Sequence, residues 1–302
     1  MHFDLHIGEG ANAVVNYILD HFTPALNFIA TVIGFVTDTI KAALTGIPMP
    51  VAVIVIVALA LWRVSWKFAL FSLLALLVIV DMGLWERTME TLSLVLAATV
   101  IAIVVGIPLG IAMAKSRIVT VLVRPVLDLM QTMPAFVYLI PAAMFFGLGA
   151  VPGTIATVIF AMPPVVRLTN LGIRQVNGEF IEAGLAFGCT ARQLLLKVQM
   201  PNALPSIMAG INQTIMLSLS MVVIASMIGA GGLGNIVLTG IQRLDVGTGF
   251  EGGLAVTVLA VILDRITQSL GQRNTAFSFG RFFGARANRG EVPSSATPPA
   301  KT

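Results

Sequence analysis

Long apolar runs separated by short polar connections dominate the pattern of the chain. A helix of about twenty apolar residues is long enough to cross the hydrocarbon core of a membrane. Seven runs approach or exceed that length, at 45–62, 66–84, 90–113, 126–147, 152–173, 203–227 and 252–270. The pattern therefore predicts an all-α fold, a polytopic transmembrane helical bundle with about seven spans.

The two ends of the chain have a different pattern. Residues 25–44 are apolar but are interrupted by Asp38 and Lys41, which is typical of an amphipathic helix lying at the membrane interface. Residues 271–302 are polar, basic and rich in Pro and Ser, and we interpret them as a disordered extension, with contact to anionic lipid as the alternative. The predicted domains are a tail with the interfacial helix (1–44), an N-terminal transmembrane hairpin (45–84), a core (85–270) and the extension (271–302).

Composition supports the membrane class and limits the chemistry. Hydrophobic residues make up 57% of the chain and charged residues 11%, and the mean hydropathy is +0.95, whereas soluble proteins carry about 25% charged residues. The single cysteine, Cys189, excludes an internal disulfide. His2, His6 and His21 lie in a polar stretch, so we predict no metal site, and nothing predicts a nucleic-acid partner. The first ten residues lack the basic start of a secretory signal peptide.

The distribution of Lys and Arg predicts the orientation. With the N-terminus outside and the C-terminus inside, fifteen of the eighteen basic residues fall on the inner side, and only Lys41, Arg87 and Arg243 fall outside. Cytoplasmic loops of membrane proteins carry this excess of positive charge. The three tryptophans fall at predicted segment ends, as interfacial aromatic residues do: Trp62, Trp66 and Trp85.

The longest inner connection, residues 174–201, is too apolar for a free loop and too polar to span. It predicts a helix over 179–187, a stop at Gly188 with positive φ, and a second helix that starts at Thr190. Thr190 and Gln193 have the spacing of a capping box. We interpret this helix–glycine–helix unit as a docking element for a partner, the alternative being a surface hairpin without one.

A family resemblance rests on the same connection. Glu182-Ala183-Gly184, three residues, Gly188, nine residues, Val198, one residue and Met200-Pro201 resemble the EAA loop of binding-protein-dependent ABC transporter permeases, with Gly184, Val198 and Met200 as conservative departures. The resemblance implies a fold like that of type I ABC importer permeases, in the bacterial cytoplasmic (inner) membrane. It also implies that the loop docks in a groove of an ATPase subunit. The coupling residues it implies are Glu182, Ala183, Gly184, Gly188, Thr190, Arg192 and Pro201.

A second resemblance covers residues 128–270. Stretches such as DLMQTMPAFVYLIPAAMFFGLG and NQTIMLSLSMVVIASMIGAGGLG are similar to the permease of glycine betaine/proline/choline importers. This implies two copies of the chain, two ATPases, an extracytoplasmic binding protein and small quaternary ammonium substrates. The chain has no G-x-x-x-x-G-K-[ST] motif, so we expect no cofactor on it and ATP–Mg on the separate ATPase.

Other function classes fit the sequence less well. A permease for methionine or another amino acid is the nearest alternative, because the EAA loop is shared across substrates. A stand-alone secondary transporter predicts a charge at the membrane midplane or an inverted repeat, and the sequence shows neither. A membrane-embedded enzyme predicts clustered His, Asp or Glu near one interface, and only Glu179 and Glu182 come close. We therefore predict a transport subunit rather than an enzyme.

Polar and proline residues inside the spans mark a candidate translocation path, although hydrogen bonding between helices explains each polar residue as well. Phe136 and Tyr138 offer a cation–π contact to a quaternary ammonium group. The candidates are Gln131, Thr132, Pro134, Phe136, Tyr138, Asn212, Gln213, Ser218 and Ser220.

The stretch GAGGLG, residues 229–234, has the spacing of a dinucleotide-binding turn. It follows an apolar span rather than a strand, so we discard that interpretation. Glycines permit backbone conformations and close helix approaches that other residues forbid. We predict an outer hinge or gate at Gly229, Gly231, Gly232 and Gly234, with a flexible loop as the alternative.

Overall fold

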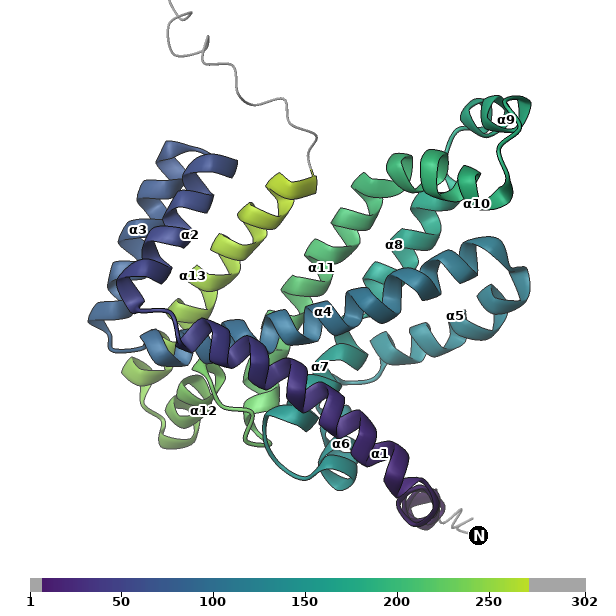
Figure 1. Ribbon diagram of the computed structural model, residues 1–302. Helices are drawn as coiled ribbons and strands as arrows, with labels where there is room; N and C mark the ends of the chain where they lie inside the picture. The colour runs from purple at the N-terminus through teal and green to yellow at the C-terminus, as the bar shows by residue number, and fades with distance from the viewer. Residues whose placement is uncertain (1–6, 272–302) are drawn as a thin grey trace, which may run out of the picture. The chain divides into compact units, whose positions relative to one another are not determined.

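A computed structural model describes residues 7–271 of the chain. The predictions for His2, His6 and residues 272–302 lie outside these residues. Every regular element in the described part is helical (Figure 1). In chain order these are α1 (Ile7–Thr45), α2 (Met49–Arg63), α3 (Trp66–Asp81), α4 (Trp85–Lys115), α5 (Arg117–Thr132), the 3-10 helix η1 (Ala135–Tyr138), α6 (Leu139–Phe146), α7 (Ala150–Ala161), α8 (Pro163–Arg174), α9 (Gly178–Ala186), α10 (Ala191–Gln193), the π-helix η2 (Leu194–Gln199), α11 (Met200–Ser226), α12 (Leu233–Arg243) and α13 (Val246–Gly271).

Length and composition support a polytopic membrane bundle. Within residues 7–271, five helical segments are long and apolar enough to cross a membrane: Val15–Thr45, Trp85–Lys115, Ala150–Arg174, Ala191–Ser226 and Val246–Leu270. Helices α5 and α6 form a sixth span if the bent pair is counted as one. Helices α2 and α3, predicted as full spans, have only 15 and 16 residues. They therefore extend about 22–24 Å, less than the ~30 Å hydrocarbon core.

The predicted span 126–147 is broken rather than continuous. Helix α5 ends at Thr132, and the axis turns by 109° before the segment Ala135–Phe146. Pro134 stands in the break, where its ring and missing N–H prevent the helix from continuing. The Tyr138 hydroxyl crosses the break and donates to the Leu129 carbonyl at 2.9 Å. The proline therefore coincides with a sharp turn between two short helices.

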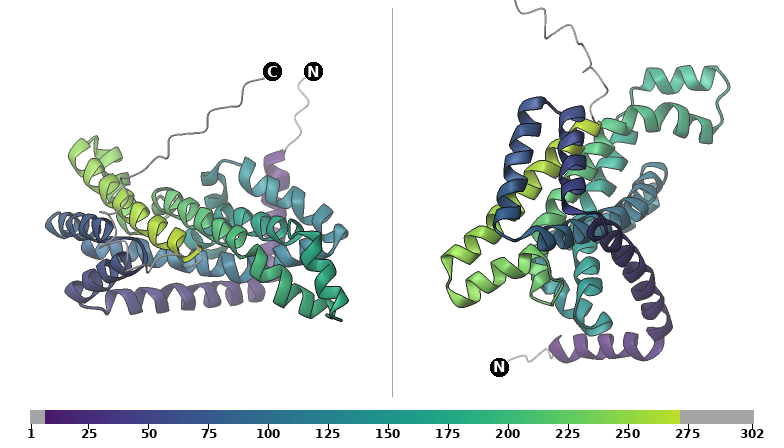
Figure 2. Two further views of the ribbon diagram at one scale, coloured as in Figure 1. Left: turned by 90° about the horizontal axis from the view of Figure 1, so that it is seen from above. Right: turned by 60° about the vertical axis from the view of Figure 1, so that its left-hand side comes forward.

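The N-terminal helix is longer than predicted. The interfacial helix expected at 25–44 is the second part of α1, which contains Pro24 and bends along its length (Figure 2, right). Helix α1 packs against α4, α6 and α7, with Thr37 buried. Its interfacial position stays a prediction.

Small residues allow the central helices to approach closely. A Cβ added to Gly110 of α4 would lie 2.7 Å from the Val166 carbonyl oxygen of α8, and one added to Gly210 of α11 would lie 3.0 Å from the Val165 Cα. Glycines at such crossings bring backbones together where hydrophobic burial alone supplies little attraction in lipid. Helices α4, α8 and α11 therefore form the tightly packed centre, and α2, α3 and α12 pack around α13 at its side.

Candidate functional site

Helices α9 and α10 project from one end of the bundle (Figure 1). We call residues 174–201 the bracket. The side chain of Asn177 caps α9 by accepting from the Glu179 N–H at 3.1 Å. Gly188 then turns the chain with φ +75°, a conformation that favours glycine. Both the first helix and the glycine stop of the sequence analysis are confirmed.

The second arm of the bracket begins with the predicted capping box. The Thr190 hydroxyl accepts from the Gln193 N–H at 3.3 Å, and the Gln193 side chain accepts from the Thr190 N–H at 2.8 Å. Two otherwise free helix N–H groups are satisfied in this way. The arm continues as the π-helix η2 into α11, a feature that the sequence did not indicate.

The inside of the bracket explains one departure from the family pattern. Gly184 of α9 is buried against the second arm, and a Cβ added there would lie 2.8 Å from the Leu194 Cδ1 and 3.5 Å from the Val198 Cγ2. Contacts below 3.0 Å require the neighbour to shift. Glycine at this position therefore leaves room for the Leu194 side chain in its present position, and a larger residue would require the flexible end of Leu194 to move.

The outside of the bracket presents an apolar patch. Phe180, Leu185 and Phe187 are 53%, 55% and 89% exposed, and the predicted coupling residues Glu182 and Ala183 are exposed beside them. The sequence analysis missed this patch, because its aromatic residues looked like the buried face of a helix. Thr190, Arg192 and Pro201 are exposed as well. The predicted coupling residues thus gather on one projecting unit, with only Gly184 buried inside it.

The base of the bracket is tied to the bundle by one guanidinium. Arg174, the last residue of α8, donates to the Met113 carbonyl at 2.8 Å and to the Thr120 hydroxyl at 3.0 Å. Met113 and Thr120 flank the turn between α4 and α5. About two turns of α8 further into the bundle is a second tie, because Arg167 donates to Gln131 and Asp128 of α5, both at 2.6 Å. Movement of the first arm therefore has to break these hydrogen bonds or displace α4 and α5 with it.

The candidate path residues fall into two groups. The first group follows the α5–η1 break, where Gln131 binds Arg167, Phe136 is 57% exposed and the Thr132 hydroxyl contacts the Leu129 carbonyl at 3.4 Å. Pro134 and Tyr138 shape the same break.

The second group lies on α11, where side chains differ sharply in exposure. Ser218 is fully buried and donates to the Thr214 carbonyl of its own helix, so its hydroxyl neither faces an open path nor bonds two helices together. Ser220 and Gln213 are exposed. Asn212 donates to the Asp264 carboxylate of α13 at 2.8 Å. Asp264 was absent from the predicted path, because only the fold brings it to Asn212.

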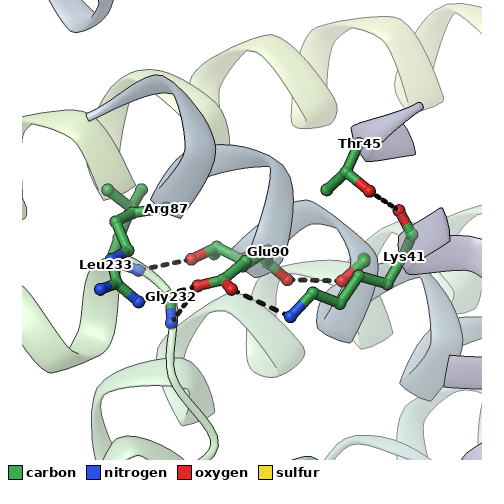
Figure 3. Close-up of polar contacts among 8 residues, drawn as sticks. Lys41, Thr45, Arg87, Glu90, Gly232 and Leu233 are labelled. Atoms are coloured by element: carbon green, nitrogen blue, oxygen red, sulfur yellow. Dashed lines mark hydrogen bonds and ion pairs between the residues drawn. The ribbon is translucent and has the colours of Figure 1, made fainter. Parts of the chain in front are cut away.

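The glycine stretch is a fixed turn that leads into α12, a helix not expected from the sequence. Gly229, Gly231 and Gly232 have φ between +72° and +84°. The Leu233 N–H, at the start of α12, donates to the Thr91 hydroxyl of α4 at 2.8 Å (Figure 3). Gly234 supplies the close helix approach that was predicted, because a Cβ there would lie 2.4 Å from the Val222 carbonyl oxygen.

Glu90 of α4 joins this turn to the N-terminal helix. Its carboxylate accepts from Lys41 of α1 at 2.9 Å, from Arg87 at 3.1 Å and from the Gly232 N–H at 3.2 Å (Figure 3). The Glu90 side chain is only 17% exposed, whereas both cations are nearly half exposed. Any motion of the glycine turn therefore has to break or carry these bonds. The role of the turn as an outer hinge or gate stays a prediction.

Comparison with known proteins places this geometry in a family. Residues 102–275 match the family model described as binding-protein-dependent transport system inner membrane component. The chain is 49% identical over 259 residues to the glycine betaine/proline betaine transport system permease protein ProW of Escherichia coli, covering 85% of this chain and 73% of the relative. It is 50% identical to the glycine betaine/carnitine transport permease protein GbuB of Listeria monocytogenes, covering 84% of this chain and 92% of the relative.

Solved structures agree on the fold. A chain of the MetNI methionine ABC transporter in an inward-facing conformation matches with a TM-score of 0.54 and 25% identity, over 63% of this chain and 94% of that one. The family model covers more than half of the chain, and the relatives at about 50% identity cover most of it. The chain is therefore a multi-pass membrane protein that belongs to the binding-protein-dependent transport system inner membrane component family.

Proposed function

We propose that the chain is the permease subunit of an ATP-driven importer of small quaternary ammonium osmolytes such as glycine betaine. The observation that carries the proposal is the identity of about 50%, over more than four fifths of the chain, to relatives named as glycine betaine permeases. The likeness to the methionine transporter has a TM-score of 0.54 at 25% identity. It supports the shared architecture and gives methionine no preference as a substrate.

The bracket is the proposed contact with the ATPase. Exposed apolar side chains on a projecting element are typical of surfaces that a partner covers, and Phe180, Leu185 and Phe187 supply them on the bracket. Glu182 and Arg192 add charges at its edge. The ATPase binds ATP–Mg, and this chain contributes the surface that senses its closure.

Transmission from the bracket follows the bonds of its two arms. The first arm is the end of α8, which Arg174 ties to the α4–α5 turn. The second arm continues through η2 into α11. Closure of the ATPases would displace both arms together and tilt α8 and α11, and so switch access between the two sides of the membrane.

The proposed orientation puts the bracket in the cytoplasm and the N-terminus outside. A second copy completes the pathway, and the binding protein docks at the opposite end, near the glycine turn that Glu90 holds. Ser220, Asn212 and the α5–η1 break remain the proposed path residues.

The test uses the whole complex. The permease, its ATPase and its binding protein are purified, and the membrane complex is placed in nanodiscs. ATP hydrolysis is then measured with the binding protein loaded with glycine betaine, choline, proline or methionine. We expect stimulation by a quaternary ammonium ligand. Stimulation by methionine alone, or no ATPase bound to the permease, would contradict the proposal.

Matched glycine variants separate docking from folding. Gly188 and Gly83 both have positive φ (+75° and +68°), and nothing lies within 4 Å of an added Cβ at either. Valine therefore introduces the same backbone strain at both positions, but only Gly188 is in the bracket. We expect Gly188→Val to lose ATPase binding and Gly83→Val to retain it. Glu182→Lys is compared in the same way with Glu251→Lys, since Glu251 is also exposed but lies in the second turn of α13, outside the bracket.

A further inference from the structure

A groove of about 280 Å³ runs between α11 and α13. This volume approaches the ~300–1,000 Å³ of small-molecule sites. Its walls are largely aliphatic, with two hydroxyl groups and one carboxylate. The lining includes Met216 and Ser220 of α11 and Val256, Thr257, Val261 and Asp264 of α13.

The carboxylate in this groove is held in place by neutral donors. Asp264 Oδ1 accepts from Asn212 Nδ2 at 2.8 Å and from Gln268 Nε2 at 2.7 Å. Asn212 is itself fixed, because the Thr267 hydroxyl donates to its Oδ1 at 2.5 Å. Within residues 7–271 no lysine or arginine forms an ion pair with Asp264, and no hydrogen bond reaches its Oδ2. The site is therefore preorganised and keeps an unneutralised negative charge.

The depth of Asp264 indicates that the groove faces water or protein rather than lipid. Asp264 lies about 8 Å along the α13 axis from the middle of Val246–Gly271. Ionisable side chains within membrane spans almost always face the bundle interior or a water-filled cavity, because their exposure to hydrocarbon is costly. The exposed side chains of Ser220 and Thr257 on the same groove fit such a cavity.

We infer that the α11–α13 groove is a transient binding site for a quaternary ammonium group, with Asp264 as its counter-ion. Methyl groups cover the charge of such a cation, so its partners are an anion or a π face together with apolar walls. The groove supplies the anion from Asp264 and apolar walls from Met216, Val256 and Val261, and no aromatic residue lines it. The site rests on the proposed function, and it adds a place of recognition inside the permease.

The test measures how cysteines in the groove react with charged reagents. Ser220→Cys is placed in a Cys189→Ser background of the complete complex, with Thr257→Cys as a second groove position. Each variant is treated with a cationic trimethylammonium-ethyl methanethiosulfonate and with its anionic sulfonate analogue. We expect the cationic reagent to react roughly tenfold faster relative to the anionic one, because of attraction to the carboxylate. Tetramethylammonium should slow this reaction.

Two controls make the result specific. Asp264→Asn combined with Ser220→Cys should abolish the preference, and Val104→Cys, 65% exposed on α4, serves as the reference position that reacts with neither reagent. Equal rates for both reagents at both groove positions, or a preference that survives Asp264→Asn, would overturn the inference. A groove as unreactive as Val104→Cys would overturn it too, since lipid or the second copy would then cover it.

The outcome is separable from the test of the proposed function. Normal ATPase stimulation by glycine betaine without any reagent preference rejects the groove alone. Failure of every quaternary ammonium ligand to stimulate the complex rejects the transport proposal, whatever the reagents show.

Discussion

Replacing Phe187 by alanine is the most direct test of the bracket as a docking surface. Phe187 follows α9 at the bracket turn and is 89% exposed. A side chain with so little contact in the free permease contributes little to its fold. The variant should therefore insert and unfold like the wild type, while binding of the ATPase weakens.

The size of the effect follows from the exposed surface. A phenylalanine buries about 150–250 Å² when it is covered. Loss of about 150 Å² of apolar contact, at about 25 cal/mol per Å², corresponds to an upper value near 3.8 kcal/mol. Interface hot spots cost about 2–4 kcal/mol on truncation. Because about 1.4 kcal/mol is tenfold in affinity, we expect the dissociation constant to rise roughly 30- to 700-fold.

The assay is binding of the purified ATPase to the permease in nanodiscs, followed by biolayer interferometry. Phe250→Ala is the matched control, because Phe250 is 68% exposed but lies near the start of α13. Its ATPase affinity should stay within a factor of two, and the melting temperature of both variants should equal that of the wild type. An unchanged affinity in Phe187→Ala would refute the assignment of this patch.

Three further outcomes follow from individual contacts. Gly232→Ala should lower stability by about 2–3 kcal/mol in a thermal-unfolding assay, because φ is +72° and the new Cβ would lie 2.5 Å from the Thr91 hydroxyl. Arg174→Ala should lower substrate transported per ATP hydrolysed in proteoliposomes, because the bracket loses its tie to the α4–α5 turn. Hydrogen bonds from the Thr248 hydroxyl and N–H lower the pKa of Asp245. The Asp245 carboxylate therefore stabilises the fold above about pH 4, and this contribution is lost as the pH falls through its lowered pKa in the folded state. The difference in stability between Asp245→Asn and the wild type, measured from unfolding curves, should therefore disappear at acidic pH.

Each outcome has an internal comparison. Gly229→Ala carries a similar positive φ, but its nearest atom is 3.8 Å away, so it should cost less stability than the change at Gly232. Arg174→Lys keeps the charge and can reach one acceptor, so it should restore part of the coupling. A gap between Asp245→Asn and wild type that stays constant down to pH 3 would show that the carboxylate has an ordinary pKa.

Local signals made the bracket predictable from sequence. Gly188 and the Thr190–Gln193 pair act on residues close to them in the chain. They therefore specify the end of one helix and the start of the next whatever the surrounding fold. Pro134 likewise marked the break after α5, although only the structure gives its 109° turn. The part of α1 before residue 25 was missed because Asp20, His21 and Pro24 interrupt its apolar pattern. Lys41, in the predicted part, has its partner far along the chain in Glu90.

Contacts between distant segments limited the site prediction. The bonds of Asp264 to Asn212 and of Arg167 to Asp128 join residues 52 and 39 positions apart. Helix periodicity cannot pair such residues, because it fixes faces and not neighbours. The start of α12 is held by a hydrogen bond from the Leu233 N–H to Thr91, 142 positions away. Because no local signal shows this contact, the residues of α12 looked like part of a loop in the sequence.

The bracket turn also contains the only cysteine of the chain, Cys189, which is partly exposed. The unaltered sequence therefore offers one native attachment point for a spin label, directly beside Gly188. In a two-copy transporter the two labels would report a single distance between the brackets. The spread of that distance with and without nucleotide would measure the opening of the assembly without any engineered residue.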